Sequence, residues 1–556
     1  MAPLLVLLAL ALLAPAAQAS PLDRPDDPIV LTGSATPSLV GAAPRDVVAF
    51  AWAGKWRQIP VQVDERKQID LRVAYPNPFG CGGNGLCYPP FSTATKLRYA
   101  DPGTLVGADT DPALDRDDEI ALMAKDAGGD AGVAADPAAV VAGSRVRIKV
   151  RDRLDRGVGY VYLFRRKGRL DPGAGASYVT YAFSLASGAY PATYKFAAGT
   201  NAESSTVVTP YYSRRFTDRW QESELSIKRG GATGADILDR NENQFAPDYC
   251  GRSRLTFARG EGAFLANRTG PVRAIRAYLG ANSGPMTESQ QIFYRGREDD
   301  TVFLRVHPIP SVMSFLDYSA AASGMTYRNN NNPGGVTVDG SPDTVAPGRL
   351  TWESVDGPQG ALTSVHTWDT DLDASKFTSF YRDQASPPAG QIPCEGDGGF
   401  YGASGPYVNG AIADTNESPS GSAPANRLTA TTTMFFDRPG AANGAQRERQ
   451  VASPLATSVK AGSPAGVKLR LRMRFGGGRK ACGRRAAFVT VAGTGLGQVR
   501  RVGLIVGKRT IATDRKRPFR LKLTERRLGG RHRVRLAVSL RGGKRLTLKA
   551  SVHGLC

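Results

Sequence analysis

The chain has 556 residues, and its 72 Lys plus Arg against 50 Asp plus Glu give a formal charge of +22. Hydrophobic residues make up 41% and charged residues 22%, which excludes a disordered chain because enough apolar surface is present to bury cores. The 63 Gly and 37 Pro favour short strands joined by turns and exclude an all-helical fold. The length predicts more than one domain.

The N-terminus has the pattern of a secretory signal. An apolar stretch covers residues 4–13, and Ala17-Gln18-Ala19 before Ser20 has the small-x-small form that signal peptidase cleaves. No later segment has the 18 consecutive apolar residues of a membrane span. We therefore predict that residues 1–19 are a signal peptide and that the protein is secreted, extracellular or associated with the cell surface.

Six cysteines follow the signal, an even number that predicts disulfides in an oxidising compartment. No Cys-x2-Cys pair is present and the four His are scattered, so a metal site built from these residues is the weaker alternative. Position along the chain predicts three pairs: Cys81 with Cys87, Cys250 with Cys394, and Cys482 with Cys556.

Residues 20–438, called the body below, are rich in β-branched and aromatic residues at strand spacing. They predict a large antiparallel β-sandwich and an all-β fold class. The run 126–141, rich in Ala, Gly and Asp, is a possible break, so one domain and two subdomains both stay open. The predicted strands in chain order are 47–51, 56–63, 146–150, 160–164, 178–183, 272–279, 301–306 and 361–368.

An acidic run at residues 109–119 is the best metal candidate of the body. Its carboxylates alternate as in a loop that surrounds calcium with oxygen atoms, although Leu114 replaces the glycine and Ile120 the bidentate glutamate of an EF-hand. A structural calcium site and a solvated acidic loop are the two interpretations, and no other cofactor is predicted. The candidate ligands are Asp109, Asp111, Asp115 and Asp117.

Residues 273–343 hold the densest mixture of Arg, Asn, Tyr and His. Arg and Asn neutralise the carboxylate of a uronic acid and so ease removal of the adjacent proton, while His or Tyr acts as base and acid. This pattern predicts a polysaccharide lyase, against the alternative that these are ordinary residues of sheet faces. The candidate catalytic residues are His307, Tyr318 and Tyr327, and the candidate substrate-binding residues are Arg276, Asn282 and Arg305.

A glycoside hydrolase would instead need two carboxylates on either side of the scissile bond. The sequence does not select a pair among several acids of the body. The candidates are Glu261, Glu288, Glu298, Asp339 and Glu353.

The charge is concentrated at the C-terminus. Residues 455–556 contain 27 Lys or Arg and two acids, Asp514 and Glu525, so the remainder of the chain is close to neutral. Residues 439–465 have the composition of a linker. Beyond them, arginines alternate with apolar residues in 469–475 and 531–538, a period of two that predicts about seven short strands with one buried face.

Residues 466–556, called the C-terminal module below, resemble the immunoglobulin-like or fibronectin-like C-terminal domains of secreted proteins from high-GC bacteria. The resemblance is carried by the alternating arginines together with Cys482 and Cys556, and covers about a fifth of the chain. It implies a small Ig-like β-sandwich that serves as an accessory domain without catalytic chemistry.

Two functions of different classes follow. The first is a secreted protein that acts on or binds extracellular polysaccharide, with an anionic or neutral polysaccharide or a cell-wall or cell-surface polymer as partner. The second is a noncatalytic cell-surface or adhesion protein anchored by its Arg-rich domain. Nucleic acid is the least favoured partner, because few aromatic residues alternate with the arginines.

Overall fold

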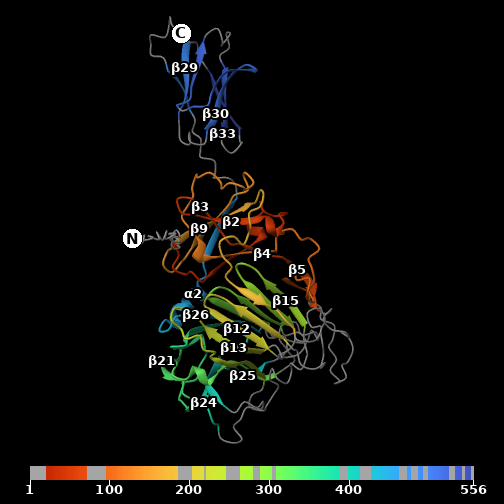
Figure 1. The fold of residues 1–556 in the computed structure, drawn as a ribbon, viewed down its shortest axis with the longest axis vertical. Coiled ribbons are helices and arrows are strands. Elements are labelled where there is room, and N and C mark those ends of the chain that lie inside the picture. The colour runs from red at the N-terminus through yellow and green to blue at the C-terminus, as the bar shows by residue number, and fades with distance from the viewer. Residues whose placement is uncertain are drawn as a thin grey trace, which may run out of the picture. The chain divides into compact units, whose positions relative to one another are not determined.

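Figure 1 shows the protein as a computed structural model. Strands form 56% of the structure and helices 7%, so the predicted all-β fold class is confirmed. No helix in the described ranges is long and apolar enough to cross a membrane. The structure describes residues 21–71, 95–185, 203–217, 221–245, 263–279, 288–303, 309–387, 399–412, 428–461, 472–476, 486–492, 499–516, 518–524, 533–540 and 545–551.

The chain divides into two compact units. The first consists of Met1–Gly129, Ile148–Tyr162 and Leu170–Val459, and the second of Asp130–Arg147, Leu163–Arg169 and Lys460–Cys556. The division at residue 459 falls inside the segment 439–465 that the sequence predicts as a linker.

Three sheets contain the first strands of the body. Their strand orders are β1-β7-β4, β27-β8-β9-β2-β3 and β5-β6. The bounds are β1 (Pro28–Thr32), β2 (Val47–Trp52), β3 (Trp56–Ile59), β4 (Gln62–Asp64), β5 (Arg66–Asp70), β6 (Thr95–Tyr99), β7 (Glu119–Met123), β8 (Val146–Arg151), β9 (Val158–Arg165) and β27 (Ala456–Ala461).

A nine-stranded antiparallel sheet forms the centre of the body. Its order is β15-β16-β17-β18-β26-β23-β22-β20-β21, and β23 and β26 pair over ten residues from Ala361↔Asp437 to Thr370↔Leu428. The bounds are β15 (Ala263–Thr269), β16 (Ala274–Leu279), β17 (Glu288–Phe293), β18 (Arg297–Phe303), β20 (Thr326–Asn329), β21 (Asn332–Thr337), β22 (Trp352–Gly357), β23 (Gly360–Thr370) and β26 (Leu428–Asp437).

Two four-stranded sheets, β10-β11-β12-β13 and β14-β19-β25-β24, share a hydrophobic core with this sheet. Tyr212 stacks on Phe436 with 3.8 Å between ring centroids, and Phe216 meets Phe293 edge to face. The layers thus form a sandwich. The bounds are β10 (Thr180–Ala182), β11 (Ser204–Val208), β12 (Tyr212–Thr217), β13 (Gln221–Ile227), β14 (Leu238–Phe245), β19 (Ile309–Tyr318), β24 (Phe377–Gln384) and β25 (Phe400–Ile412).

A short helix, α2 (Gly444–Ala452), lies where the sequence predicts a linker. Asn443 caps its first turn by accepting the backbone N–H of Gln446 at 3.1 Å. At Gly444 an added Cβ would lie 1.9 Å from the Trp352 ring, so only glycine allows this approach. Tertiary packing therefore stabilises a helix whose sequence has no clear apolar periodicity.

The other helices in the described ranges are single 3-10 turns between strands. Their bounds are η1 (Gly33–Ala35), η2 (Pro44–Asp46), η4 (Ala124–Asp126), η6 (Ala320–Ala322) and η7 (Ala374–Lys376).

The described part of the C-terminal module has seven strands in two sheets, β28-β29-β32 and β31-β30-β33-β34. Eleven buried residues form its core, all of them Val, Leu or Phe. The apolar residues of the alternating pattern that predicted these strands thus face the core. The bounds are β28 (Arg472–Gly476), β29 (Ala486–Ala492), β30 (Val499–Val506), β31 (Arg509–Asp514), β32 (Arg520–Thr524), β33 (Arg533–Leu540) and β34 (Arg545–Ser551).

Candidate functional site

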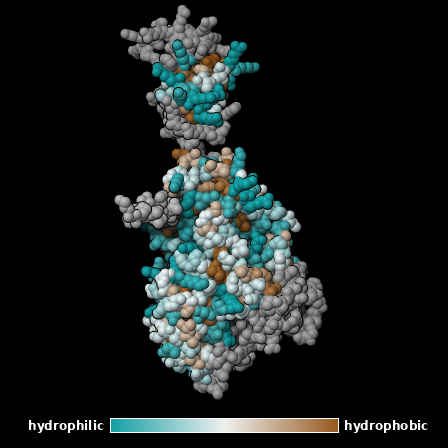
Figure 2. All heavy atoms as spheres, viewed as in Figure 1, coloured by the Kyte–Doolittle hydropathy of each residue, from teal (hydrophilic) through white to brown (hydrophobic). Residues whose placement is uncertain are grey.

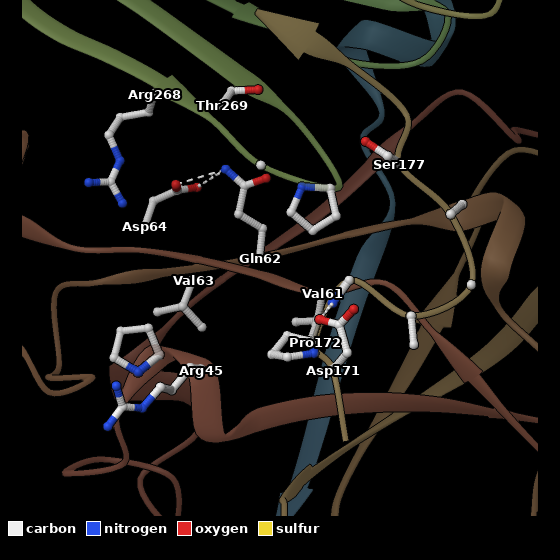
Figure 3. Close-up of a pocket in the computed structure, with 17 residues that line it drawn as sticks. Arg45, Val61, Gln62, Val63, Asp64, Asp171, Pro172, Ser177, Arg268 and Thr269 are labelled. Atoms are coloured by element: carbon white, nitrogen blue, oxygen red, sulfur yellow. Dashed lines mark hydrogen bonds between the residues drawn. The ribbon is translucent and has the colours of Figure 1, made fainter. Parts of the chain in front are cut away.

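A cavity of about 820 Å³ opens in the first unit (Figure 3). Its volume lies within the range of roughly 300 to 1,000 Å³ that is typical of ligand sites. Four separate parts of the chain line it: η2, β4 with the residue before it, the Gly-rich loop 171–177, and the end of β15 with the loop that follows. The lining residues are Pro44, Arg45, Val61, Gln62, Val63, Asp64, Asp171, Pro172, Gly173, Ala174, Gly175, Ala176, Ser177, Arg268, Thr269, Gly270 and Pro271.

Buried polar groups hold one wall of the cavity rigid. Gln62 accepts the backbone N–H groups of Val272 and Arg273 and donates to Asp64 at 2.8 Å. Asp64 in turn accepts from Arg273, whose Nη2 also bonds Glu119 at 2.7 Å. Because these groups are mutually satisfied, they shape the cavity and leave recognition to other residues.

The same network shifts the pKa of its members. Burial alone would lower the pKa of the Arg273 guanidinium, but the neighbouring Tyr99, Asp64, Tyr294 and Glu119 raise it well above its usual value. Burial raises the pKa of Glu119, yet Arg273, Arg66 and Tyr99 together outweigh burial and lower it. Arg273 and Glu119 are therefore both charged at neutral pH.

Two arginines on one side of the cavity are available for a ligand (Figure 3). Arg45 is exposed on η2, and Arg268 is half-buried on β15 with one bond to the carbonyl oxygen of Ala100 at 3.2 Å. Within the described ranges neither forms a close ion pair with a carboxylate, although Arg268 acts on Glu65 at longer range and opposes the rise in the pKa of that carboxyl. Guanidinium groups in this state bind carboxylate, sulfate or phosphate.

The opposite side of the cavity carries oxygen atoms. Asp171 is exposed, and its Oδ1 accepts the N–H of Gly173 at 2.9 Å, while Ser177 is exposed at the other end of the loop. Gly175 has a φ of +110°, a conformation that favours glycine and turns the loop around the opening. The arrangement offers cations to an anionic group and oxygen atoms to hydroxyl groups.

Two predicted catalytic residues, Tyr318 and Tyr327, lie in the hydrophobic core, 3% and 0% exposed. The Tyr327 hydroxyl donates to Glu353 at 3.2 Å and accepts from Asn329 at 3.0 Å. Burial raises the pKa of both phenols, and the Glu353 carboxylate raises it further. Both therefore stay protonated at neutral pH.

Glu353 also connects this network to His366. The His366 Nε2 lies 3.0 Å from Glu353 Oε1, and its Nδ1 lies 3.1 Å from the hydroxyl of Thr432. The four side chains Tyr327, Glu353, His366 and Thr432 come from β20, β22, β23 and β26 and share one face of the nine-stranded sheet. The structure thus joins Tyr327 to groups that the sequence did not place with it.

The predicted substrate-binding residue Arg276 is 0% exposed. Its guanidinium donates to both carboxylate oxygens of Glu203, at 3.1 and 2.6 Å, and to Gln291 at 2.7 Å. Gln291 continues to Glu222, which pairs with Arg214. Arg276 thus belongs to a buried ion-pair network and does not line the cavity.

The acidic run brings together three aspartates, and this set differs from the predicted ligand set. Ligand atoms of Asp109, Asp115 and Asp118 lie within 4.8 Å of one another, so Asp118 takes the place of Asp111 and Asp117. The cause is a local turn in which Asp115 Oδ1 accepts the N–H groups of residues 117 and 118, at 3.0 and 3.2 Å. Oxygen ligands in this arrangement suit a hard cation such as calcium.

Desolvation raises the pKa of Asp118 to about 6, against the opposing effect of two backbone N–H groups, from Asp115 and Arg66, that its carboxylate accepts. Burial and the hydrogen bond to Asp117 also raise the pKa of Asp115. Both pKa values rise because the carboxylates are partly buried and because negatively charged neighbours lie close to them. A bound cation would instead lower the pKa of both carboxyls.

Several predicted residues lie outside the described ranges. They are the signal peptide 1–19, the cysteines Cys81, Cys87, Cys250, Cys394, Cys482 and Cys556, the hydrolase candidate Glu261, and the lyase candidates Asn282, Arg305 and His307.

No family model matches the chain, and no curated protein matches it. Among solved structures, the chain is similar to a protein from Escherichia coli K12 described as an aldose 1-epimerase. The TM-score is 0.23 and the identity 8%, over 47% of this chain and 100% of that one.

The sequence did not point to Arg45 or Arg268, because the segments that line the cavity are spread over more than 200 residues of the chain. The run Asp171-Pro172-Gly173-Ala174-Gly175 was a usable signal, since Pro and Gly mark a loop and functional groups gather on loops.

Proposed function

We propose that this is an exported protein whose body binds an acidic extracellular polysaccharide in the cavity that Arg45 and Arg268 line on one side. One observation carries the proposal: two arginines that form no close ion pair in the described ranges face Asp171 and Ser177 across a cavity of about 820 Å³. A uronic acid has a carboxylate for the arginines and hydroxyl groups for the opposite side.

The rigid wall supports the same function. The bonds among Gln62, Asp64 and Arg273 fix the cavity before a ligand arrives, so little conformational entropy is lost on binding. A cavity with cations on one side also discriminates against neutral sugars, which leave the arginines without a new partner.

The test is the affinity of the protein for oligogalacturonate, measured by titration calorimetry, with neutral dextran oligosaccharides as the comparison. We expect Arg268→Gln and Arg45→Gln each to weaken binding roughly tenfold. Arg153→Gln is the matched control, because Arg153 is exposed in the same unit and does not line the cavity. Equal affinity for dextran, or equal loss in the control, would refute the proposal.

Catalysis by β-elimination stays a prediction that the same samples test. Ultraviolet absorbance of unsaturated uronate in the mixture would indicate a lyase and would make His307 the next residue to substitute, since Tyr318 and Tyr327 lie in the core and do not line the cavity. Binding without absorbance or reducing-end release would favour the noncatalytic alternative.

A further inference from the structure

The two sides of the cavity in the body carry opposite charges. Arg45 and Arg268 line one side, and Asp171 lines the other (Figure 3). The side chain of Asp171 is exposed, and within the described ranges its carboxylate forms no close ion pair. A ligand in the cavity therefore meets cations on one side and a free carboxylate on the other.

The second carboxylate that lines the cavity is not free. Asp64 is 1% exposed, and its Oδ2 accepts from Arg273 at 2.8 Å. Gln62 also donates to both oxygen atoms of Asp64, at 2.8 and 3.1 Å. Among the described residues of the lining, Asp171 is thus the carboxylate that a ligand can use.

Hydrogen bonds hold Asp171 in one position. Its carbonyl oxygen accepts the side-chain N–H of Gln58 at 2.5 Å and the backbone N–H of Ala174 at 3.1 Å. Its Oδ1 accepts the backbone N–H of Gly173 at 2.9 Å. These bonds present Oδ2 to the cavity before a ligand arrives, so little conformational entropy is lost when a ligand binds it.

Apolar contact contributes little to selectivity in this cavity. None of the described residues that line it is aromatic, and the large apolar side chains that are exposed in the described ranges, all Val or Leu, lie elsewhere. Figure 2 shows hydrophilic and weakly polar residues over most of the visible described surface. Charge and hydrogen bonds therefore determine which ligand the cavity prefers.

We propose that the ligand carries an amino group as well as a carboxylate, and that Asp171 is the residue that selects the amino group. This inference rests on the proposed function of the same cavity and narrows its substrate class to an acidic polysaccharide with amino sugars that are not acetylated. The arginines bind the carboxylate, and Asp171 Oδ2 accepts from the ammonium group.

Electrostatic complementarity is the reason for this choice. A chain with carboxylates alone is attracted by the arginines but repelled by Asp171, whereas a chain with both charges is attracted by both sides. The cavity volume of about 820 Å³ lies near the upper end of the range for ligand sites, roughly 1,000 Å³, so the two groups can belong to neighbouring sugars.

The experiment compares two heparosan tetrasaccharides, which consist of uronic acid and glucosamine, one fully N-acetylated and one with its acetyl groups removed. Their affinities for the full-length protein are measured by titration calorimetry. Removing the acetyl groups makes the ligand less anionic, so binding by arginines alone would weaken. We expect the deacetylated ligand to bind roughly three- to fivefold more tightly. This preference should disappear at a pH at which the sugar's amine is neutral.

Asp171→Asn tests the residue directly. It keeps an acceptor for the N–H of Gly173 but removes the charge, so it should abolish the preference. Asp155→Asn is the matched control, because Asp155 is also exposed, its Oδ1 accepts the N–H of Gly157 at 2.6 Å, and it does not line the cavity. This control should keep the preference, and unchanged thermal unfolding shows that both variants are folded.

Three outcomes would overturn the inference. Tighter binding of the acetylated ligand, or equal effects of the two Asp variants, would contradict the role of Asp171 alone if Arg268→Gln still weakens the binding of both ligands. No effect of Arg268→Gln on either ligand would contradict the proposed function as well. A gain in affinity for the acetylated ligand on addition of calcium, absent in Asp171→Asn, would make Asp171 a cation ligand in place of the ammonium site.

Discussion

Charged side chains cross the interior of the body, whereas the core of the C-terminal module's described part contains no charged side chain. In the body, Arg214, Glu222 and Glu298 are at most 1% exposed and bonded to one another between two sheets. In the described part of the module every buried side chain is apolar. A large sandwich can surround a chain of ion pairs with enough apolar contact, while a small one needs its whole interior for hydrophobic burial.

The contrast also concerns what holds each fold in one arrangement. The body's ion pairs join residues of different sheets. Because an ion pair requires a defined geometry, these pairs favour one alignment of the layers. The module's core has no such polar constraint, and its alignment rests on the fit of Val, Leu and Phe side chains. The two regions should therefore respond differently to substitution.

The largest effect is expected from Arg214→Met in the body. Removing this cation leaves Glu222 and Glu298 buried without their partner, which should cost about 3 to 5 kcal/mol of unfolding free energy. Urea unfolding of the full-length protein measures it. The neighbour Arg215 pairs with Glu224 at 45% exposure, so Arg215→Met should cost less than about 0.5 kcal/mol.

Adding Glu222→Gln and Glu298→Gln to Arg214→Met sharpens the test. If uncompensated charge causes the loss, the triple variant should recover part of the stability, because neutral side chains cost less to bury. A triple variant as unstable as Arg214→Met would show that packing volume, and not charge, dominates this interior.

The next effect is expected in the module's core. Leu504 is 0% exposed, so Leu504→Ala leaves a cavity and should cost about 2 to 4 kcal/mol. Hydrogen exchange of peptides from 499–506 reports the change locally. Ile505→Ala, on the face of β30 that points away from the core, should cost under about 1 kcal/mol, since Ile505 is half-buried. Equal effects at the two positions would contradict the inside-outside assignment of β30.

The smallest effect concerns pH and the acidic group of the body. The pKa of Asp118 is about 6 in the folded state against 3.8 for an ordinary Asp, so the folded state binds more protons between these values. Its contribution to the free energy of unfolding therefore falls as the pH rises from about 4 to about 6. Asp118→Asn should remove this slope from the stability profile.

Calcium gives the complementary measurement on the same residue. The cation and the proton compete for the carboxylates of Asp109, Asp115 and Asp118, so addition of calcium should raise the unfolding temperature at pH 7 and have less effect below pH 6. No shift at pH 7 would favour the solvated acidic loop over a calcium site.

Local patterns predicted much of the fold. The segments 47–51 and 361–368 became β2 and β23 because β-branched and aromatic residues favour a pleated, half-buried surface. The helix α2 was missed because its stability comes from Asn443 and from packing against Trp352, which no local pattern shows.

The site was less accessible to sequence reasoning. Arg276 was assigned to substrate because it is an Arg among Tyr and Asn, but its partner Glu203 is 73 residues away. Such pairings depend on how sheets stack. Nothing in the sequence around Arg268 distinguishes it from other strand residues. It lines the same cavity as Arg45 only because of the tertiary fold.

The contacts of Arg24 have a consequence for biogenesis. Its guanidinium donates to the carbonyl oxygens of Gln450 and Ser453 at the end of α2, both at 2.7 Å, across 426 and 429 residues of chain. Arg24, which is synthesised early, thus waits for one of the last segments of this unit before its guanidinium can form these two hydrogen bonds. Since β1 can already pair with β7 in that interval, the step that waits for residue 453 is the docking of α2 on Arg24.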